Sequence, residues 1–385
     1  MLGTTTGSGV SAGGTSESTE GRGNNSAPVA TVPFIRASQQ HREPAGIDVT
    51  RTLTTSDQDL GVFEIPAYGY VRSVVILVTS ASGTGTTLVA TEDAPFCALK
   101  NVALTEPNGA TLTAVSSGYS LAMINKYGGY HYANDPRQDP NFLASTATVF
   151  NFGFLTRIPV ELNVRDALGS LPNQNSGATF KLRLTLAGSG QLIASGSITQ
   201  QPTVRVRVYL EAWDQPEAST AGLANSVTPP AMNTTQFWTE QIYTPPAGDT
   251  TTRLNRVGNY VRELLFINRR TSGLSRANGE SDFPARSTLY FDTRPLDIVD
   301  KELWRSQVYE RYGFNGTLEA AGARDNGVFP YDFAHEFDGK VGNENRDLWL
   351  PTLSSTRLEL QGNYGSASTL TCLTNDVAVA GTVFL

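Results

Sequence analysis

The sequence predicts an all-β protein built from two tandem antiparallel sandwich or jelly-roll domains with short inserted helices. Three observations support this fold class. Charged residues make up only 17% of the 385 residues, whereas 36 Gly and 20 Pro favour many short strands joined by irregular loops. Segments with period-two hydrophobic alternation recur along the chain. Several short patterns of the first half also return, in the same order, in the second half.

Residues 1–44 are predicted to form a flexible or extended N-terminal arm. Residues 1–28 are rich in Gly, Ser and Thr, so burial cannot offset the entropy lost when they become ordered. Residues 29–44 carry enough apolar side chains to dock as an extended strand or strap: Val29, Val32, Phe34 and Ile35. Two interpretations stay open for the arm, a clamp between subunits that orders on assembly and a disordered leader.

The first jelly roll is predicted over residues 45–214. Its clearest strand is Thr203–Trp213, in which five apolar residues alternate with five larger or charged ones. This alternation directs the apolar set into a core and the other set, which includes Glu211 and Trp213, toward solvent or a neighbour. A second strand is predicted over residues 180–186. The remaining predicted strands cover residues 70–79, 98–105, 148–155 and 160–164.

A Pro-rich linker is predicted over residues 215–236, and the second jelly roll over 237–385. The recurring patterns favour two copies of one domain. Their offsets run from 171 residues (Pro159 to Pro330) to 190 residues (Tyr70 to Tyr260). The matched pairs are 70–72 with 260–262, 158–160 with 329–331, 165–166 with 346–347, and 182–184 with 357–360.

One amphipathic helix is predicted within the second domain. Asp297 is the expected N-cap and Gly313 the expected stop. The expected apolar face consists of Val299, Leu303, Trp304, Val308 and Tyr312. Because a jelly roll tolerates an elaborated loop, this helix is expected to pack against the sandwich.

No catalytic, cofactor-binding or metal-binding residue is predicted. Cys97 and Cys372 are far apart in apolar contexts and are expected to be buried thiols, with a disulfide or a reactive thiol as the alternative. The most polar cluster is Asp332, His335, Glu336 and Asp338, which fits a strand edge or loop better than a cation site or an acid–base pair. The acidic loop at 134–140 lacks the spacing of a calcium loop and is expected to be solvated or interfacial.

The overall charge argues against nucleic-acid binding. The net charge is −7, and residues 1–35 contain one basic residue, Arg22, whereas binding to phosphates depends on Lys and Arg. The longest aliphatic run, at 74–78, is far shorter than the roughly 20 residues of a membrane-spanning helix. The N-terminus also has no basic stretch followed by an apolar core, so a secretory signal is not expected.

Several segments resemble the major capsid proteins of tectiviruses. Tyr70-Val-Arg-Ser-Val-Val-Ile-Leu-Val-Thr, residues 88–109 and Ser117-Gly-Tyr-Ser-Leu resemble their first jelly roll. Phe291-Asp-Thr-Arg-Pro-Leu-Asp, running into Glu302-Leu-Trp-Arg, is similar to the matching part of their second jelly roll. The resemblance extends in order over residues 45–365 and consists of packing and turn residues.

The resemblance implies an all-β fold of two tandem eight-stranded antiparallel jelly rolls, a double jelly roll. It also implies a non-enzymatic major capsid protein made in the host cytoplasm and located in the virion. It implies strands perpendicular to the capsid surface and pseudo-hexagonal homotrimers in an icosahedral shell around a membrane and double-stranded DNA. The implied partners are neighbouring trimers, penton or vertex and minor capsid proteins, and the internal lipid membrane, without direct contact with nucleic acid. The arm departs from relatives whose N-terminal segment is helical and lies near the membrane, since residues 1–28 show no helical pattern.

Two other functions are compatible with the same fold class. A carbohydrate-binding or glycan-hydrolysing β-sandwich would need an aromatic-lined cleft, and the hydrolase would need two converging carboxylates. A vertex or spike protein of the same virion would be present in fewer copies. The internal duplication and the arm favour the shell-forming subunit.

Overall fold

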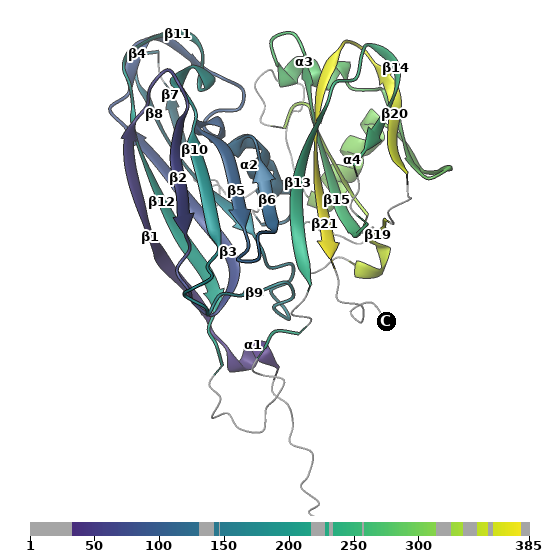
Figure 1. Cartoon of the computed structure of the whole chain (residues 1–385). Helices are drawn as coiled ribbons and strands as arrows, with labels where there is room; N and C mark the ends of the chain where they lie inside the picture. Colours follow the sequence, from purple (N-terminus) through teal and green to yellow (C-terminus); the bar gives the residue numbers. More distant parts are fainter. Residues whose placement is uncertain are drawn as a thin grey trace, which may run out of the picture.

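The computed structural model describes residues 33–130, 142–145, 147–216, 228–230, 234–255, 258–312, 325–333, 345–352 and 357–378. Two β-sandwiches stand side by side with their strands running along the same general direction (Figure 1). The short helix α1 (Phe34–Ala37) lies at one end of the first sandwich, and the two-stranded sheet of β4 (Thr84–Ala90) and β11 (Ile193–Gln200) lies at the other.

The first sandwich has two facing sheets with four core strands each. One sheet has the order β1 (Gln40–Thr52), β12 (Thr203–Trp213), β3 (Tyr70–Ala81) and β8 (Phe150–Pro159). β7 (Phe142–Ser145) extends this sheet, and β9 (Leu171–Pro172) pairs with β3. The other sheet has the order β2 (Gln58–Glu64), β10 (Lys181–Leu186), β5 (Leu99–Thr105) and β6 (Thr111–Val115).

The second sandwich has the same organisation. One sheet has the order β13 (Thr235–Tyr243), β21 (Ser368–Ala378), β15 (Tyr260–Arg270) and β18 (Val328–Asp332), with β19 (Leu350–Pro351) beside β15. The other has the order β14 (Gly248–Leu254), β20 (Leu358–Tyr364), β16 (Arg286–Phe291) and β17 (Arg294–Asp300). α3 (Arg276–Asp282) follows β15, and α4 (Lys301–Tyr312) follows β17.

The strand order confirms the predicted double jelly roll. Within each sandwich the first, eighth, third and sixth core strands form one sheet, and the second, seventh, fourth and fifth form the other. That order is the one in which a jelly roll winds its strands. In both sandwiches a helix connects the fifth core strand to the sixth: α2 (Gly118–Tyr127) in the first and α4 in the second.

The recurring sequence patterns occupy equivalent places in the two jelly rolls. Arg72 of β3 and Arg262 of β15 are each the extra residue of a β-bulge. A Leu-Pro strand, β9 or β19, pairs with the Tyr-Val that precedes each bulge. The match between Pro159 and Pro330 is out of structural register by two residues. Pro159 pairs with Ser73, but the residue that pairs with the equivalent Glu263 is Asp332.

Most predicted strands are present. β12 has the predicted bounds, and its five inward residues are all buried. The predicted strand at 160–164 is wrong. There the backbone N–H groups of Val160 and Glu161 both donate to the carbonyl of Arg72, and Leu162 pairs across a turn with Leu168. Val160 and Leu162 are buried in a loop whereas Val164 is exposed, so the alternation of apolar residues here does not reflect a strand.

The predicted helix begins later than expected. Asp297 and Val299 belong to β17, which forms a hairpin with β16, and α4 begins at Lys301. Trp304 and Val308 are buried as predicted, but Leu303 is half exposed. The alternating pattern from 294 to 300 suits a strand as well as a helix, and the partner strand β16 decides between them.

Part of the predicted arm belongs to the first jelly roll. Residues 40–44 begin β1, which pairs with β12 on both sides of an irregularity between Pro44 and Asp48. Phe34 docks as predicted, although in the short helix α1 rather than in an extended strap, and its ring lies 5.3 Å from Tyr70 and 6.2 Å from Trp213. Residues 1–32 lie outside the described part of the chain.

Candidate assembly surface

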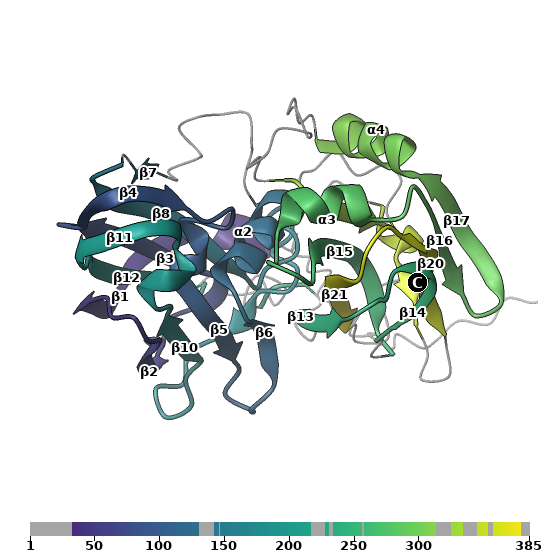
Figure 2. The ribbon, with the colours of Figure 1, turned by 90° about the horizontal axis from the view of Figure 1, so that it is seen from above.

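The two jelly rolls are joined edge to edge within the chain. β13 runs parallel to β6, with Trp238 opposite Thr113, so one continuous sheet passes through both sandwiches. α2 lies between the sandwiches (Figures 1 and 2), and all of its residues except Lys126 are buried. Buried apolar residues of both sandwiches form a single hydrophobic cluster. This junction shows how one jelly roll of this chain packs against another.

A buried ion cluster holds one end of this junction. Arg276 at the start of α3 is fully buried and donates to Asp93 at 2.6 Å, and Arg269 of β15 donates to the same carboxylate at 2.7 Å. Both guanidinium groups also lie over the ring of Tyr119 on α2, at 4.3 and 5.4 Å. Burial alone would raise the pKa of Asp93, but the two arginines outweigh it and lower the pKa.

The other end of the junction is held by neutral and charged hydrogen bonds. The side-chain amide of Gln236 on β13 donates to the carbonyls of Val160 and Glu161, at 3.1 and 3.0 Å. Arg262, the bulge residue of β15, donates to the carbonyl of Gly128 at the end of α2 and to Asn375 of β21. These bonds satisfy loop carbonyls of the first jelly roll with side chains of the second.

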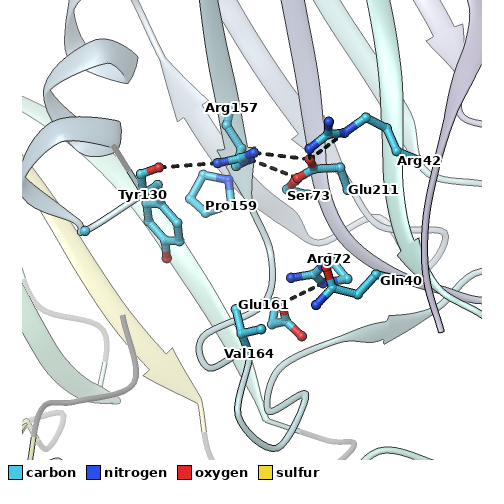
Figure 3. A pocket seen from close by; sticks show the side chains of 11 residues that line it. Gln40, Arg42, Arg72, Ser73, Tyr130, Arg157, Pro159, Glu161, Val164 and Glu211 are labelled. Atoms are coloured by element: carbon cyan, nitrogen blue, oxygen red, sulfur yellow. Dashed lines mark hydrogen bonds and ion pairs between the residues drawn. The ribbon is translucent and has the colours of Figure 1, made fainter. Parts of the chain in front are cut away.

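A second charge cluster lies on the outer face of the first jelly roll (Figure 3). Glu211 of β12 accepts hydrogen bonds from Arg157 of β8 at 3.0 and 3.1 Å, from Arg42 of β1 at 2.8 Å, and from Ser73 of β3. Burial by itself would raise the pKa of Glu211, but Arg157 and the hydrogen bonds from Ser73, Arg42 and Arg157 lower it to about 2. Glu211 therefore stays ionised at neutral pH.

Glu161 occupies the same cavity beside that cluster. It accepts from Arg72 at 2.8 Å, from the indole of Trp213 at 2.5 Å and from Ser170 at 3.1 Å. Burial raises the pKa of Glu161, an effect that Arg72 and these hydrogen bonds only partly offset. The cavity has a volume of about 290 Å³. Its lining is formed by residues of β1, β3, β8 and β12 and of the loops after α2 and β8: Gln40, Arg42, Arg72, Ser73, Gly129, Tyr130, Arg157, Pro159, Glu161, Val164 and Glu211.

This cavity corrects one part of the sequence analysis. Glu211 and Trp213 were expected to face solvent or a neighbour, yet both are buried within the chain. α1 covers Trp213, whose ring contacts Phe34, and Arg42 of β1 and Arg157 of β8 flank Glu211. The signal in the sequence was Trp213 itself, because Trp is highly buried on average, whereas Glu is rarely buried unless it is paired.

Of the acidic and histidine residues considered for chemistry, one lies in the described part of the chain, Asp332. Asp332 is buried at the end of β18 and pairs with Arg311 at 2.5 Å, whereas His335, Glu336, Asp338 and the loop at 134–140 lie outside the described residues. In the described part of the chain, no three His, Cys, Asp or Glu residues are grouped to hold a metal ion. Cys97 and Cys372 are buried free thiols, as expected. Among the described residues, no helix is long and apolar enough to cross a membrane.

Comparisons of sequence find no relatives: no protein-family model matches the chain, and no curated protein matches it. Comparison of structures places the fold among double jelly-roll major capsid proteins. The STIV MCP, from Sulfolobus Turreted Icosahedral Virus, matches with a TM-score of 0.61 and 15% identity over 89% of this chain and 97% of that chain. PBCV-1 VP54 matches with 0.57 and 10% identity over 88% and 93%.

The major capsid protein P2 of bacteriophage PM2 matches with a TM-score of 0.53 and 10% identity, over 90% of this chain and 99% of that one. Each of these alignments covers both jelly rolls and nearly the whole length of the other protein. At such low identity the likeness establishes the shared fold.

Proposed function

We propose that this chain is the major capsid protein of an icosahedral virus, which assembles as pseudo-hexagonal homotrimers around an internal membrane and double-stranded DNA. The observation that carries the proposal is the duplication. Two jelly rolls of identical strand order lie side by side in one chain, so three chains present six similar domains around one axis. The structurally similar proteins are capsid subunits, which supports a structural role rather than an enzymatic one.

The partners follow from this role. Side faces of the trimers would contact neighbouring trimers, and penton or vertex and minor capsid proteins would complete the shell. The acidic composition, with a net charge of −7, supports a shell that faces lipid rather than nucleic acid. We further propose that residues 1–32, which precede the docked Phe34, act as a clamp between subunits. The two jelly-roll domains then extend from β1 to β12 (residues 40–213) and from β13 to β21 (residues 235–378).

The solution mass of the purified chain tests the proposal. Multi-angle light scattering is expected to give three times the 41.3 kDa chain mass, and electron microscopy of the same sample is expected to show compact particles with six-fold outline. A stable monomer that binds glycans on an array, or hydrolyses them, would refute the proposal and support the alternative of a carbohydrate-active sandwich.

A further inference from the structure

Each jelly roll has two opposite sides, and the single chain uses one side of each. The first jelly roll presents β6 and α2 to the second, and the second receives them with β13 and the outer face of the β13–β21–β15–β18 sheet. The remaining sides are β1 with the outer face of its own sheet on the first jelly roll, and β17 with α4 on the second. Figure 2 shows β1 and β17 at opposite ends of the molecule. Both are edge strands among the described residues.

The free side of the first jelly roll is equivalent to the used side of the second, residue by residue. Gln40 pairs with Trp213, and Gln236 pairs with Val377. Trp213 and Val377 each belong to the second residue pair beyond the bulge in their sheet, so strand register relates Gln40 to Gln236. The same register relates Arg42 to Trp238 and Glu211 to Asn375, and the bulges relate Arg72 to Arg262.

In the second jelly roll these positions bind the first. Gln236 and Arg262 hold carbonyls that follow β8 and α2, and Trp238 is fully buried against β6. In the first jelly roll the equivalent residues Gln40 and Arg72 line the cavity of Figure 3. Arg42, the counterpart of Trp238, has a side chain that is 65% exposed. The cavity is thus the open counterpart of an interdomain contact that is closed elsewhere in the same chain.

The free side of the second jelly roll carries exposed apolar residues where the first is covered. On β17, Leu296 and Ile298 are 41% and 57% exposed, and on α4, Leu303 and Tyr309 are 51% and 53% exposed. The equivalent helix α2 is almost wholly buried. Large exposed apolar side chains beside an unpaired strand edge mark a surface that pairs with another chain.

We propose that β17 and α4 of one copy dock on β1 and the outer face of the β1–β12–β3–β8 sheet of the next, in the way that β6 and α2 dock on the second jelly roll within the chain. This head-to-tail contact closes after three chains, because each chain supplies two of six equivalent steps around the axis. The inference rests on the proposed homotrimer and specifies its interface.

Cysteine cross-linking tests this interface. Pro44→Cys on β1 and Leu296→Cys on β17 replace exposed residues of the two edges, while the native thiols are buried. The double variant, oxidised after assembly, is expected to shift on a non-reducing gel to two and three times the 41.3 kDa chain mass. Either single variant alone is expected to stay monomeric on that gel, and a mixture of the two is expected to give dimers only.

A matched control replaces Pro44→Cys by Val89→Cys, an exposed apolar position on the distant two-stranded sheet of β4 and β11. This control is expected to give no cross-link with Leu296→Cys. A trimer by light scattering that yields no cross-link in the double variant would overturn the interface and leave the homotrimer intact. Self-linking of a single variant would replace the head-to-tail contact by a two-fold one. A chain that stays monomeric at every concentration would refute both the interface and the proposed function.

Discussion

Replacing Glu211 by Gln tests whether the charge cluster of Figure 3 stabilises the first jelly roll through ionisation. Its folded pKa is about 2, against an ordinary value of 4.5. A depressed pKa contributes stability that is fully present above pH 4.5 and is lost as the pH falls toward 2. This pKa difference corresponds to about 3 kcal/mol of unfolding free energy at pH 7, of which roughly 1 kcal/mol remains at pH 3.

The assay is chemical unfolding of the wild type and Glu211→Gln at pH 7 and pH 3, at one fixed protein concentration. The variant is expected to lose about 3 kcal/mol of unfolding free energy at pH 7 and about 1 kcal/mol at pH 3. Asp48→Asn, which removes an exposed partner of Arg205 on the same sheet, provides the control and should change stability little at either pH. An equal loss for Glu211→Gln at both pH values would show that packing, not ionisation, accounts for the effect.

Three further predictions concern the core, the thiols and the arm. Trp304→Ala should lower the free energy of unfolding in urea by about 3–5 kcal/mol, because the indole packs on Phe266 and Phe329 and donates to a backbone carbonyl. A decrease under about 1 kcal/mol would contradict this packing. Burial raises the pKa of both Cys97 and Cys372 to about 12, so neither should react with a thiol reagent at pH 8 until denaturant is added, and a fast native phase would argue otherwise. Deleting residues 1–32 should leave the circular dichroism spectrum and melting temperature unchanged but reduce particle yield, and a normal yield would exclude the clamp.

The fold was predictable because it depends on local patterns. Strands such as β12 alternate regularly, and the duplicated segments kept their order, although Pro159 and Pro330 are two residues out of structural register. Hydrophobic periodicity predicted the wrong structure in the loop after β8 and at the start of α4, because burial and hydrogen bonding are not periodic there. In both places the distant partner decides the conformation, and no local pattern contains that partner.

The charge cluster was not predictable for the same reason. Arg42 and Glu211 are 169 residues apart in sequence, and Arg72 reaches the cavity only because a bulge adds one residue to β3. The alternation of β12 assigns Glu211 to the outer face correctly but says nothing about what covers that face. The equivalence of Arg72 and Arg262 could be proposed from the sequence. The hydrogen bond from Arg262 to the end of α2 could be found only in the structure.

The pairing of β1 with β12 also has a consequence for biosynthesis. β1 is among the first structured segments to leave the ribosome, but its partner strand follows about 170 residues later. At about 5–20 residues per second, β1 waits roughly 10 to 30 s for that partner. Such distant pairings also slow the folding step itself. An unpaired strand that persists for this interval can pair with other nascent copies, so β1 is open to intermolecular mispairing until β12 emerges.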